Sequence, residues 1–204
     1  MDAIGRRLWQ LKSTGIVLEQ CLDIGAYRGQ FTSVVKALYP ACKVQQFEAD
    51  ERQRSYIPFA KFVLLGDADR EAIFYTLPEH TCTTGSSVFV ENTLHYAKPI
   101  QLTLPMKTLD AVADYSGDWS KGLVKMDTQG SELMILKGAT KLLAKRPRFF
   151  LIECSVQPYN VGAPLINEVI SAMKDYGYTI KDFWDMSYDQ QGSLLQTDIL
   201  FEAT

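Results

Sequence analysis

The spacing of hydrophobic residues predicts strands and helices that alternate along most of the chain. From Phe31 to Leu38 the apolar residues recur at intervals of three and four, which places them on one face of a helix, and a strand-like run at 21–24 comes shortly before them. Similar short runs lie at 43–48, 61–66, 122–127, 148–154, 178–184 and 194–202. This alternation is typical of a mainly parallel sheet with helices on both faces.

Further helical spacing is found at 2–13, 130–145 and 164–176. Pro147 follows the second of these ranges and Gly177 follows the third, and both residue types commonly stand just after the end of a helix. We therefore expect helices over these ranges.

Two regions depart from the simple alternation. Between residues 70 and 105 the helical spacing is lost, and the runs EAIFYTL, SSVFVE and PIQLTLP predict antiparallel strands around the polar turn TCTTG. The strands at 178–184 and 194–202 are joined by SYDQQGS, which is too short for the helix that a parallel connection needs. We expect an inserted β-hairpin region beside the sheet and an antiparallel pair of strands at its end.

Composition and charge narrow the range of functions. The chain has 204 residues, of which 47% are hydrophobic and 22% charged, which suits a single domain over residues 1–204. Its formal net charge of -3 argues against a nucleic-acid partner. We expect no membrane span and no secretion signal, since the long apolar runs that these require are missing. Cys21, Cys42, Cys82 and Cys154 form no CxxC pair, which indicates reduced thiols in a cytoplasmic protein.

The turn DIGAYRG joins the first strand to its helix, where doubly wound sheets commonly bind ligands. It lacks the lysine of a nucleoside-triphosphate loop, and Tyr27 occupies the place of the second glycine of a dinucleotide loop. S-adenosylmethionine carries positive charge and no phosphate, so Asp23 at the end of the first strand suits it. Glu48, at the end of the second strand, suits its ribose hydroxyls. Small residues in such a turn can also serve close packing without any ligand.

At these residues the chain resembles a known family. In order, CLDIGAYRGQFTSVVKALYP, FEAD, GSSVF, LVKMDTQGSELMILKGA and FFLIECS are similar to the FkbM family of S-adenosylmethionine-dependent methyltransferases, and the similarity covers residues 20 to about 185. The resemblance implies a Rossmann-like class I methyltransferase fold, an α/β fold with a seven-stranded, mainly parallel sheet whose last strand is reversed. It also implies O-methylation. Two positions depart from the family pattern, because Tyr27 stands for its usual asparagine and Ala49 for its usual proline.

We accordingly expect S-adenosyl-L-methionine as the cofactor. The residues that we predict to bind it lie in and after the first strands, with one more acid at the end of the strand at 122–127. They are Asp23, Gly25, Tyr27, Gly29, Glu48, Ala49, Asp67 and Asp127.

Methyl transfer to an alcohol requires alignment and removal of a proton. We predict Asp127, Lys125, Glu153 and His95 as the catalytic candidates. Lys125 and Asp127 are two residues apart on one strand, so their side chains share a face, and they could also form a purely structural ion pair. Carboxylates at Asp127 and Glu153 could hold magnesium, but no third oxygen ligand is evident, so we predict no metal. Glu132 is better explained as a helix cap.

The sequence therefore predicts an S-adenosylmethionine-dependent O-methyltransferase acting on a hydroxyl of a small acceptor, such as a saccharide or secondary metabolite. One alternative is a catalytically silent module of the same fold that binds the cofactor or a partner. A nucleotide-dependent oxidoreductase is a second alternative. A homodimer is compatible with the sequence, which does not identify the acceptor.

Overall fold

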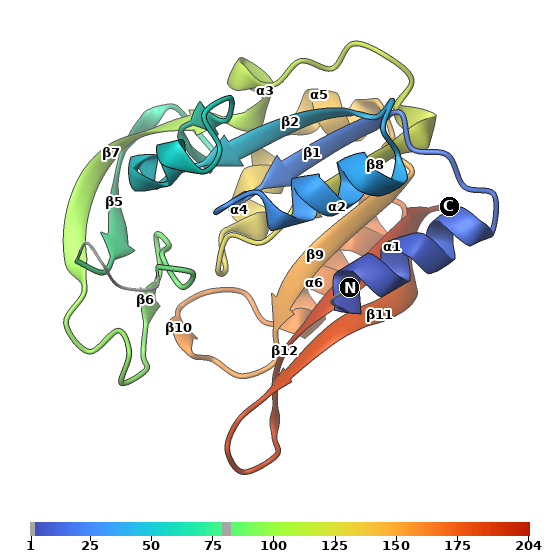
Figure 1. The fold of residues 1–204 in the computed structure, drawn as a ribbon. Coiled ribbons are helices and arrows are strands. Elements are labelled where there is room, and N and C mark those ends of the chain that lie inside the picture. Colours follow the sequence, from blue (N-terminus) through green and yellow to red (C-terminus); the bar gives the residue numbers. More distant parts are fainter. Residues whose placement is uncertain (1–2, 79–82) are drawn as a thin grey trace.

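The computed structural model describes residues 3–78 and 83–204. Its centre is a seven-stranded sheet in the order β11-β12-β9-β8-β1-β2-β3 (Figure 1). The strands are β1 (Gln20–Ile24), β2 (Lys43–Glu48), β3 (Lys61–Phe62), β8 (Gly122–Met126), β9 (Phe149–Ser155), β11 (Tyr178–Tyr188) and β12 (Leu194–Ala203). Strands β3, β2, β1, β8 and β9 are parallel, whereas β12 runs antiparallel to both β9 and β11. The predicted class I sheet with a reversed last strand is confirmed.

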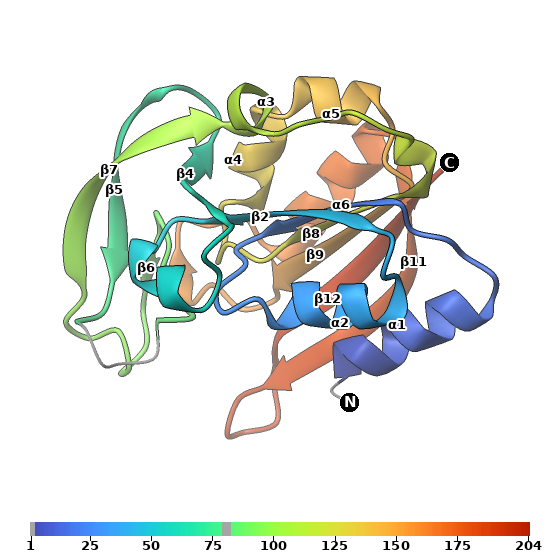
Figure 2. The same ribbon diagram turned by 45° about the horizontal axis from the view of Figure 1, so that its top comes forward.

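Helices cover both faces of this sheet (Figure 2). On one face lie α1 (Ala3–Ser13) and α2 (Gln30–Leu38), and on the other lie α3 (Leu109–Val112), α4 (Glu132–Lys137), α5 (Thr140–Ala144) and α6 (Ile166–Asp175). Two short 3-10 helices, η1 (Glu51–Ser55) and η2 (Trp119–Lys121), precede strands. Alternate residues of the central strands therefore enter two separate apolar cores, as expected for a sheet covered on both faces.

The continuous helix predicted at 130–145 is wrong. The chain forms α4 and α5 with a break at Gly138, where a Cβ atom would lie 2.2 Å from the Gly66 carbonyl oxygen. The break lets the chain pass close to the strand that contains Gly66. Leu136 and Leu142, on either side of it, still enter the same core, which explains why the helical spacing continues through the break.

The region between β3 and β8 forms a second, three-stranded sheet in the order β4-β7-β5. It consists of β4 (Leu64–Gly66), β5 (Arg70–Thr76) and β7 (Ile100–Thr108), and Figure 1 shows β5 and β7 beyond the carboxyl end of β2. The antiparallel pairing of the runs at 71–77 and 99–105 is confirmed. The single strand predicted at 61–66 is wrong, because β3 joins the main sheet while β4 joins the second sheet and buries Leu64 against Phe74 and Met106.

The run SSVFVE does not become a strand of that hairpin. Within it, Ser87 makes one bridge to Tyr75, and β6 (Val90–Glu91) pairs instead with β10 (Asn160–Val161). The Ser87 hydroxyl donates to the carbonyl oxygens of Thr128 and Gln129, which draws this segment towards the loop after β8. The predicted turn TCTTG lies in part outside the described residues.

The cysteines and the helices relate to two expectations from the sequence, namely reduced thiols and no membrane span. Cys21, Cys42 and Cys154 are free and buried, and Cys82 lies outside the described residues. Within the described ranges, none of the helices has both the length and the apolar character needed to cross a membrane.

Candidate active site

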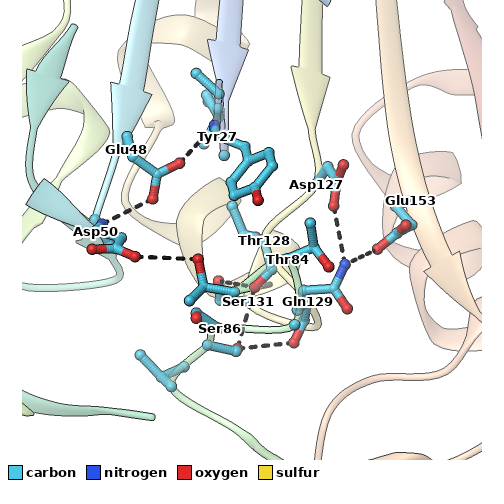
Figure 3. A pocket seen from close by; sticks show the side chains of 18 of the residues that line it. Tyr27, Glu48, Asp50, Thr84, Ser86, Asp127, Thr128, Gln129, Ser131 and Glu153 are labelled. Carbon is cyan, nitrogen blue, oxygen red and sulfur yellow. Dashed lines mark hydrogen bonds between the residues drawn. The ribbon is translucent and has the colours of Figure 1, made fainter. Parts of the chain in front are cut away.

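A cavity of about 650 Å³ opens at the carboxyl ends of β1, β2, β8 and β9, within the usual 300–1,000 Å³ range of small-molecule sites (Figure 3). Segments far apart in the sequence form its wall: the turn after β1, the FEAD segment after β2, the 83–96 segment of the inserted region, and the loop after β8. The end of β9 and the start of β12 close it. This is the edge where parallel α/β sheets bind ligands.

The turn after β1 requires glycine at Gly25. This residue has a φ of 74°, in the left-handed region, and a Cβ atom there would lie 1.9 Å from the Asp127 carbonyl oxygen. Gly29 also has a positive φ, of 77°, and packs against Ile57, but it is not part of the cavity wall. Gly25 thus allows the loop after β8 to approach the first turn closely.

Tyr27 lines the cavity although its backbone lies in the left-handed region, with a φ of 48°. Its N–H donates to Glu48 Oε2 at 2.7 Å. The Arg28 guanidinium lies 5.0 Å from the centre of the Tyr27 ring and 4.5 Å from that of the Tyr56 ring. These cation–π contacts help to hold Tyr27 in its left-handed backbone conformation. Figure 3 shows the Tyr27 ring between Glu48 and Asp127.

Glu48 forms one end of the cavity. Its Oε1 accepts the Asp50 N–H at 2.8 Å, and its Oε2 accepts the Tyr27 N–H. Burial raises the pKa of the Glu48 carboxyl, although these N–H bonds oppose the rise. A carboxylate oxygen can accept two hydrogen bonds, so each oxygen can take a further donor from a ligand.

Asp50 and Arg52 connect this end to the inserted region. Arg52 makes a two-pronged contact with Asp50, at 2.7 and 2.8 Å, and also donates to the Thr76 hydroxyl at 2.6 Å. Thr76 is in turn 2.7 Å from the Ser86 hydroxyl, which lies 3.2 Å from the Tyr96 hydroxyl. Ser86 and Tyr96 line the cavity, so the inserted region is held as part of its wall.

Lys125 lies on the floor, next to the end of β1. Its Nζ is 3.0 Å from Asp127 Oδ2, 3.9 Å from Asp23 Oδ1 and 3.2 Å from the Gly25 carbonyl oxygen. Burial alone would lower the pKa of Lys125, but the two carboxylates outweigh it and raise this pKa. Burial tends to raise the pKa of Asp127, but Lys125 holds it below its ordinary value.

Asp23 does not line the cavity. It is fully buried, its Oδ2 accepts the Thr32 hydroxyl at 2.6 Å, and burial raises its pKa. Through Lys125 it contributes to the charge balance of the floor. Asp67 also lies away from the cavity, on the surface, where it pairs with Arg70 at 2.8 Å.

Glu153 forms the other end of the cavity, with Asp127 and Gln129 (Figure 3). The Gln129 amide nitrogen donates to Asp127 Oδ1 at 3.1 Å and to Glu153 Oε2 at 2.5 Å. The Gln196 amide nitrogen donates to Glu153 Oε1, and the Tyr159 hydroxyl donates to Gln196 Oε1. The pKa of Glu153 is raised well above its ordinary value by burial and by the nearby Asp127 and Asp198 carboxylates.

Of the remaining residues considered from the sequence, His95 and Ala49 lie at the cavity and Glu132 lies in the first turn of α4. The His95 ring is edge-on to Tyr96 at 5.5 Å. Glu132 is buried and accepts the N–H and hydroxyl of Thr128 at 2.8 and 2.9 Å, so it fixes the loop before α4, in keeping with a capping role. Within residues 3–78 and 83–204, no group of three or more His, Cys, Asp or Glu side chains is placed to hold a metal ion.

Sequence reasoning missed three residues at the Glu153 end. Gln129 belongs to the phrase KMDTQGSELMILKGA that carries the resemblance, so its place in that phrase was a usable signal. Tyr159 and Gln196 belong to no motif. Gln196 reaches Glu153 because β12 pairs antiparallel with β9, and Tyr159, just before β10, reaches Gln196. Only the folded chain makes these contacts.

Comparison with protein families decides the assignment. Residues 23–180 match the family described as the methyltransferase FkbM domain. The chain belongs to the FkbM methyltransferase family. The resemblance is therefore confirmed, and no curated protein sequence matches the chain.

Solved structures agree with the class I fold of this FkbM chain. It is similar to a methyltransferase FkbM from Methylobacillus flagellatus KT, with 16% identity and a TM-score of 0.51, over 90% of this chain and 43% of that one. It is also similar to magnesium protoporphyrin IX methyltransferase (ChlM) from Synechocystis PCC 6803 with bound SAM, with 9% identity and a TM-score of 0.50, over 99% and 78%. The methyltransferase domain of bacterial-CtHen1-CN aligns at 15% identity with a TM-score of 0.50, over 97% and 96%. The chain thus spans less than half of the first of these proteins.

Proposed function

We propose that this chain is an S-adenosylmethionine-dependent O-methyltransferase that acts on a hydroxyl of a small, uncharged acceptor of the saccharide or secondary-metabolite class. One observation carries the proposal: a single cavity at the carboxyl ends of the strands has Glu48 at one end and Asp127 with Glu153 at the other. The family assignment supports methyl transfer as the reaction.

The cavity suits this cofactor better than a phosphate-bearing nucleotide. Gly25 and Tyr27 of the first turn line the cavity, and Glu48 offers carboxylate oxygens suited to a pair of ribose hydroxyls. Among the described residues of the wall, Lys125 is the one lysine or arginine, and it is engaged by Asp127 and Asp23. Carboxylates therefore dominate the charge of the wall, which favours a cationic ligand and disfavours a polyphosphate.

When bound, S-adenosylmethionine supplies an electrophilic methyl group for transfer to the acceptor. We assign binding of its ribose to Glu48, and contact with the rest of the molecule to the backbone of Gly25 and Tyr27. Asp127, fixed by Lys125, contributes negative charge at the opposite end. Glu153 receives the proton of the acceptor hydroxyl on a carboxylate oxygen, because a carboxyl of raised pKa is a stronger base.

The inserted region supports this acceptor class. Thr84, Ser86, Thr93 and Tyr96 bring hydroxyl groups to the wall, and hydroxyls can both donate to and accept from the oxygens of a polyhydroxylated compound. Glu91 and Glu153, on the same wall, have no lysine or arginine partner among the described residues. An acceptor carrying a phosphate or carboxylate would be repelled here, so an uncharged polyol is favoured.

The test has two stages. Calorimetry with S-adenosylhomocysteine, NAD and ATP should show binding of the first and none of the others at equal concentration. Incubation with S-adenosylmethionine and matched neutral and anionic sugars should then release S-adenosylhomocysteine with neutral sugars only. Binding without turnover on any acceptor would favour a silent binding module, and tighter binding of NAD would contradict the proposal.

A further inference from the structure

The two carboxylate oxygens of Glu153 are each held by a different glutamine amide. Gln129, in the loop after β8, donates to Oε2, and Gln196, on β12, donates to Oε1. We propose that Gln129 and Gln196 are positioning residues that orient Glu153 and favour its ionised form as the proton acceptor, and that Tyr159 fixes Gln196 in this role. This inference rests on the proposed function of the cavity.

The backbone conformation of Gln129 supports the positioning role of its side chain. Gln129 has a φ of 56°, a left-handed conformation that costs a non-glycine residue about 1 kcal/mol or more. Glycine would remove that cost, as it does next to it at Gly130, where φ is 103°. Glycine has no side chain to donate, whereas the Gln129 amide nitrogen reaches both Asp127 Oδ1 and Glu153 Oε2 from this position, which gives a reason for the strained glutamine.

Tyr159 determines which end of the Gln196 amide meets Glu153. Its hydroxyl donates to Gln196 Oε1, so the amide oxygen is occupied and the amide nitrogen turns towards Glu153. Without that hydroxyl the amide can rotate and present its oxygen to the carboxylate, which would repel the ionised form. Tyr159 and Gln196 both line the cavity beside Glu153.

The surroundings of Glu153 make such donors necessary. Burial and the carboxylates of Asp127 on β8, Asp198 on β12 and Glu132 on α4 all disfavour its ionised form. Lys125 points to Asp127 and Asp23 instead. The two amides are the hydrogen-bond donors that the described residues supply to the Glu153 carboxylate, and they oppose these effects.

The acceptor hydroxyl loses its proton to a Glu153 oxygen, which becomes a carboxylic acid, while the acceptor oxygen uses its electron pair to bond the methyl carbon. The electron pair of the broken carbon–sulfur bond remains on sulfur. The proton then leaves Glu153 to solvent when the product departs.

The experiment measures the Glu153 carboxyl directly and needs no acceptor. In protein with ¹³C-labelled glutamate carboxyls, the signal missing from Glu153→Gln assigns Glu153, and its shift is followed with pH. Gln196→Met and Gln129→Met should raise the midpoint by about one to two pH units, as expected for loss of a charge-assisted hydrogen bond. Tyr159→Phe should raise it by less.

Two comparisons make this result specific. Asp198→Asn removes a neighbouring negative charge and should move the midpoint in the opposite direction, to lower pH. Gln101→Met, on the exposed surface of β7, should leave it unchanged. Unchanged midpoints in Gln196→Met and Gln129→Met, in proteins that unfold at the wild-type temperature, would overturn the inference.

Binding of S-adenosylhomocysteine, measured on the same proteins, separates this inference from the proposed function. Affinity near the wild-type value together with unmoved midpoints would refute the positioning role alone. Moved midpoints without any binding, in wild type as well, would refute the proposed function. Once an acceptor is found, the acid limb of the pH–rate profile should move with the midpoint in each variant.

Discussion

The two ends of the cavity hold their carboxylates in different ways. Glu48 accepts hydrogen bonds from backbone N–H groups, those of Tyr27 and Asp50, whereas Glu153 accepts them from the side-chain amides of Gln129 and Gln196. Backbone donors are placed by the fold and survive most substitutions, while side-chain donors can be removed one at a time. We therefore expect ligand binding at the Glu48 end to tolerate most substitutions nearby. Proton transfer at the Glu153 end should change when either glutamine is replaced.

The largest effect is expected at the Glu153 end. Glu153→Gln keeps the shape of the side chain but removes its ability to take a proton. We expect kcat to fall by about 10²–10⁴-fold, the usual contribution of a positioned base. Affinity for S-adenosylhomocysteine should change little. A variant that turns over at the wild-type rate would remove Glu153 from the chemistry.

The next effect concerns the lysine between the two ends. Lys125→Met leaves the carboxylates of Asp127 and Asp23 without their cation, and we expect a loss of about 3 kcal/mol in the free energy of unfolding by urea. This is the low end of the range for a broken buried pair, because the Asp127 side chain is 34% exposed. Lys107→Met, which breaks the exposed pair with Asp69, should cost much less. Equal losses in the two variants would argue against a buried network.

A smaller effect is expected at the Glu48 end. Glu48→Ala should weaken binding of S-adenosylhomocysteine by about tenfold or more, since charge-assisted bonds to the ligand are lost. Glu51→Ala, three residues along and exposed, is the matched control and should bind as the wild type does. Calorimetry at one temperature compares the two. Unchanged affinity in Glu48→Ala would exclude Glu48 from the site.

The smallest effect, within any one pH unit, is a change in the pH dependence of stability near Glu153. Burial, followed by the Asp127 charge, raises the pKa of Asp198 to about 7. Between about pH 4 and that value the folded chain holds a proton that the unfolded chain has released, so this group's contribution to stability is lost as pH rises. Asp198→Asn should flatten the stability curve there by at most about 1.4 kcal/mol per pH unit. Parallel curves for wild type and variant would contradict the raised pKa.

Much of the fold could be predicted because its signals are local. The helical spacing after DIGAYRG and the short connection SYDQQGS each depend on a few neighbouring residues, and both predictions are confirmed. The run at 61–66 is predicted as one strand because both of its halves are apolar. It divides between two sheets because β3 pairs with β2 while β4 pairs with β7, which is some forty residues away in sequence.

The site could be predicted only in part, for the same reason. Glu48 ends β2 and Asp127 follows β8, two strands of one parallel sheet, so their meeting at one edge follows from topology. The burial of Asp23 behind the turn could not be foreseen, because it depends on how Thr32 and Lys125 reach its carboxylate. Contacts of Gln196 and Tyr159 with each other arise from chain segments that no local pattern relates.

A crystal structure of the chain soaked with S-adenosylhomocysteine would show directly where the ligand binds. We expect ribose hydroxyls within hydrogen-bonding distance of the Glu48 carboxylate and the sulfur atom directed towards Asp127 and Glu153. Density for the nucleoside outside this cavity, or with its ribose at the Glu153 end, would contradict it.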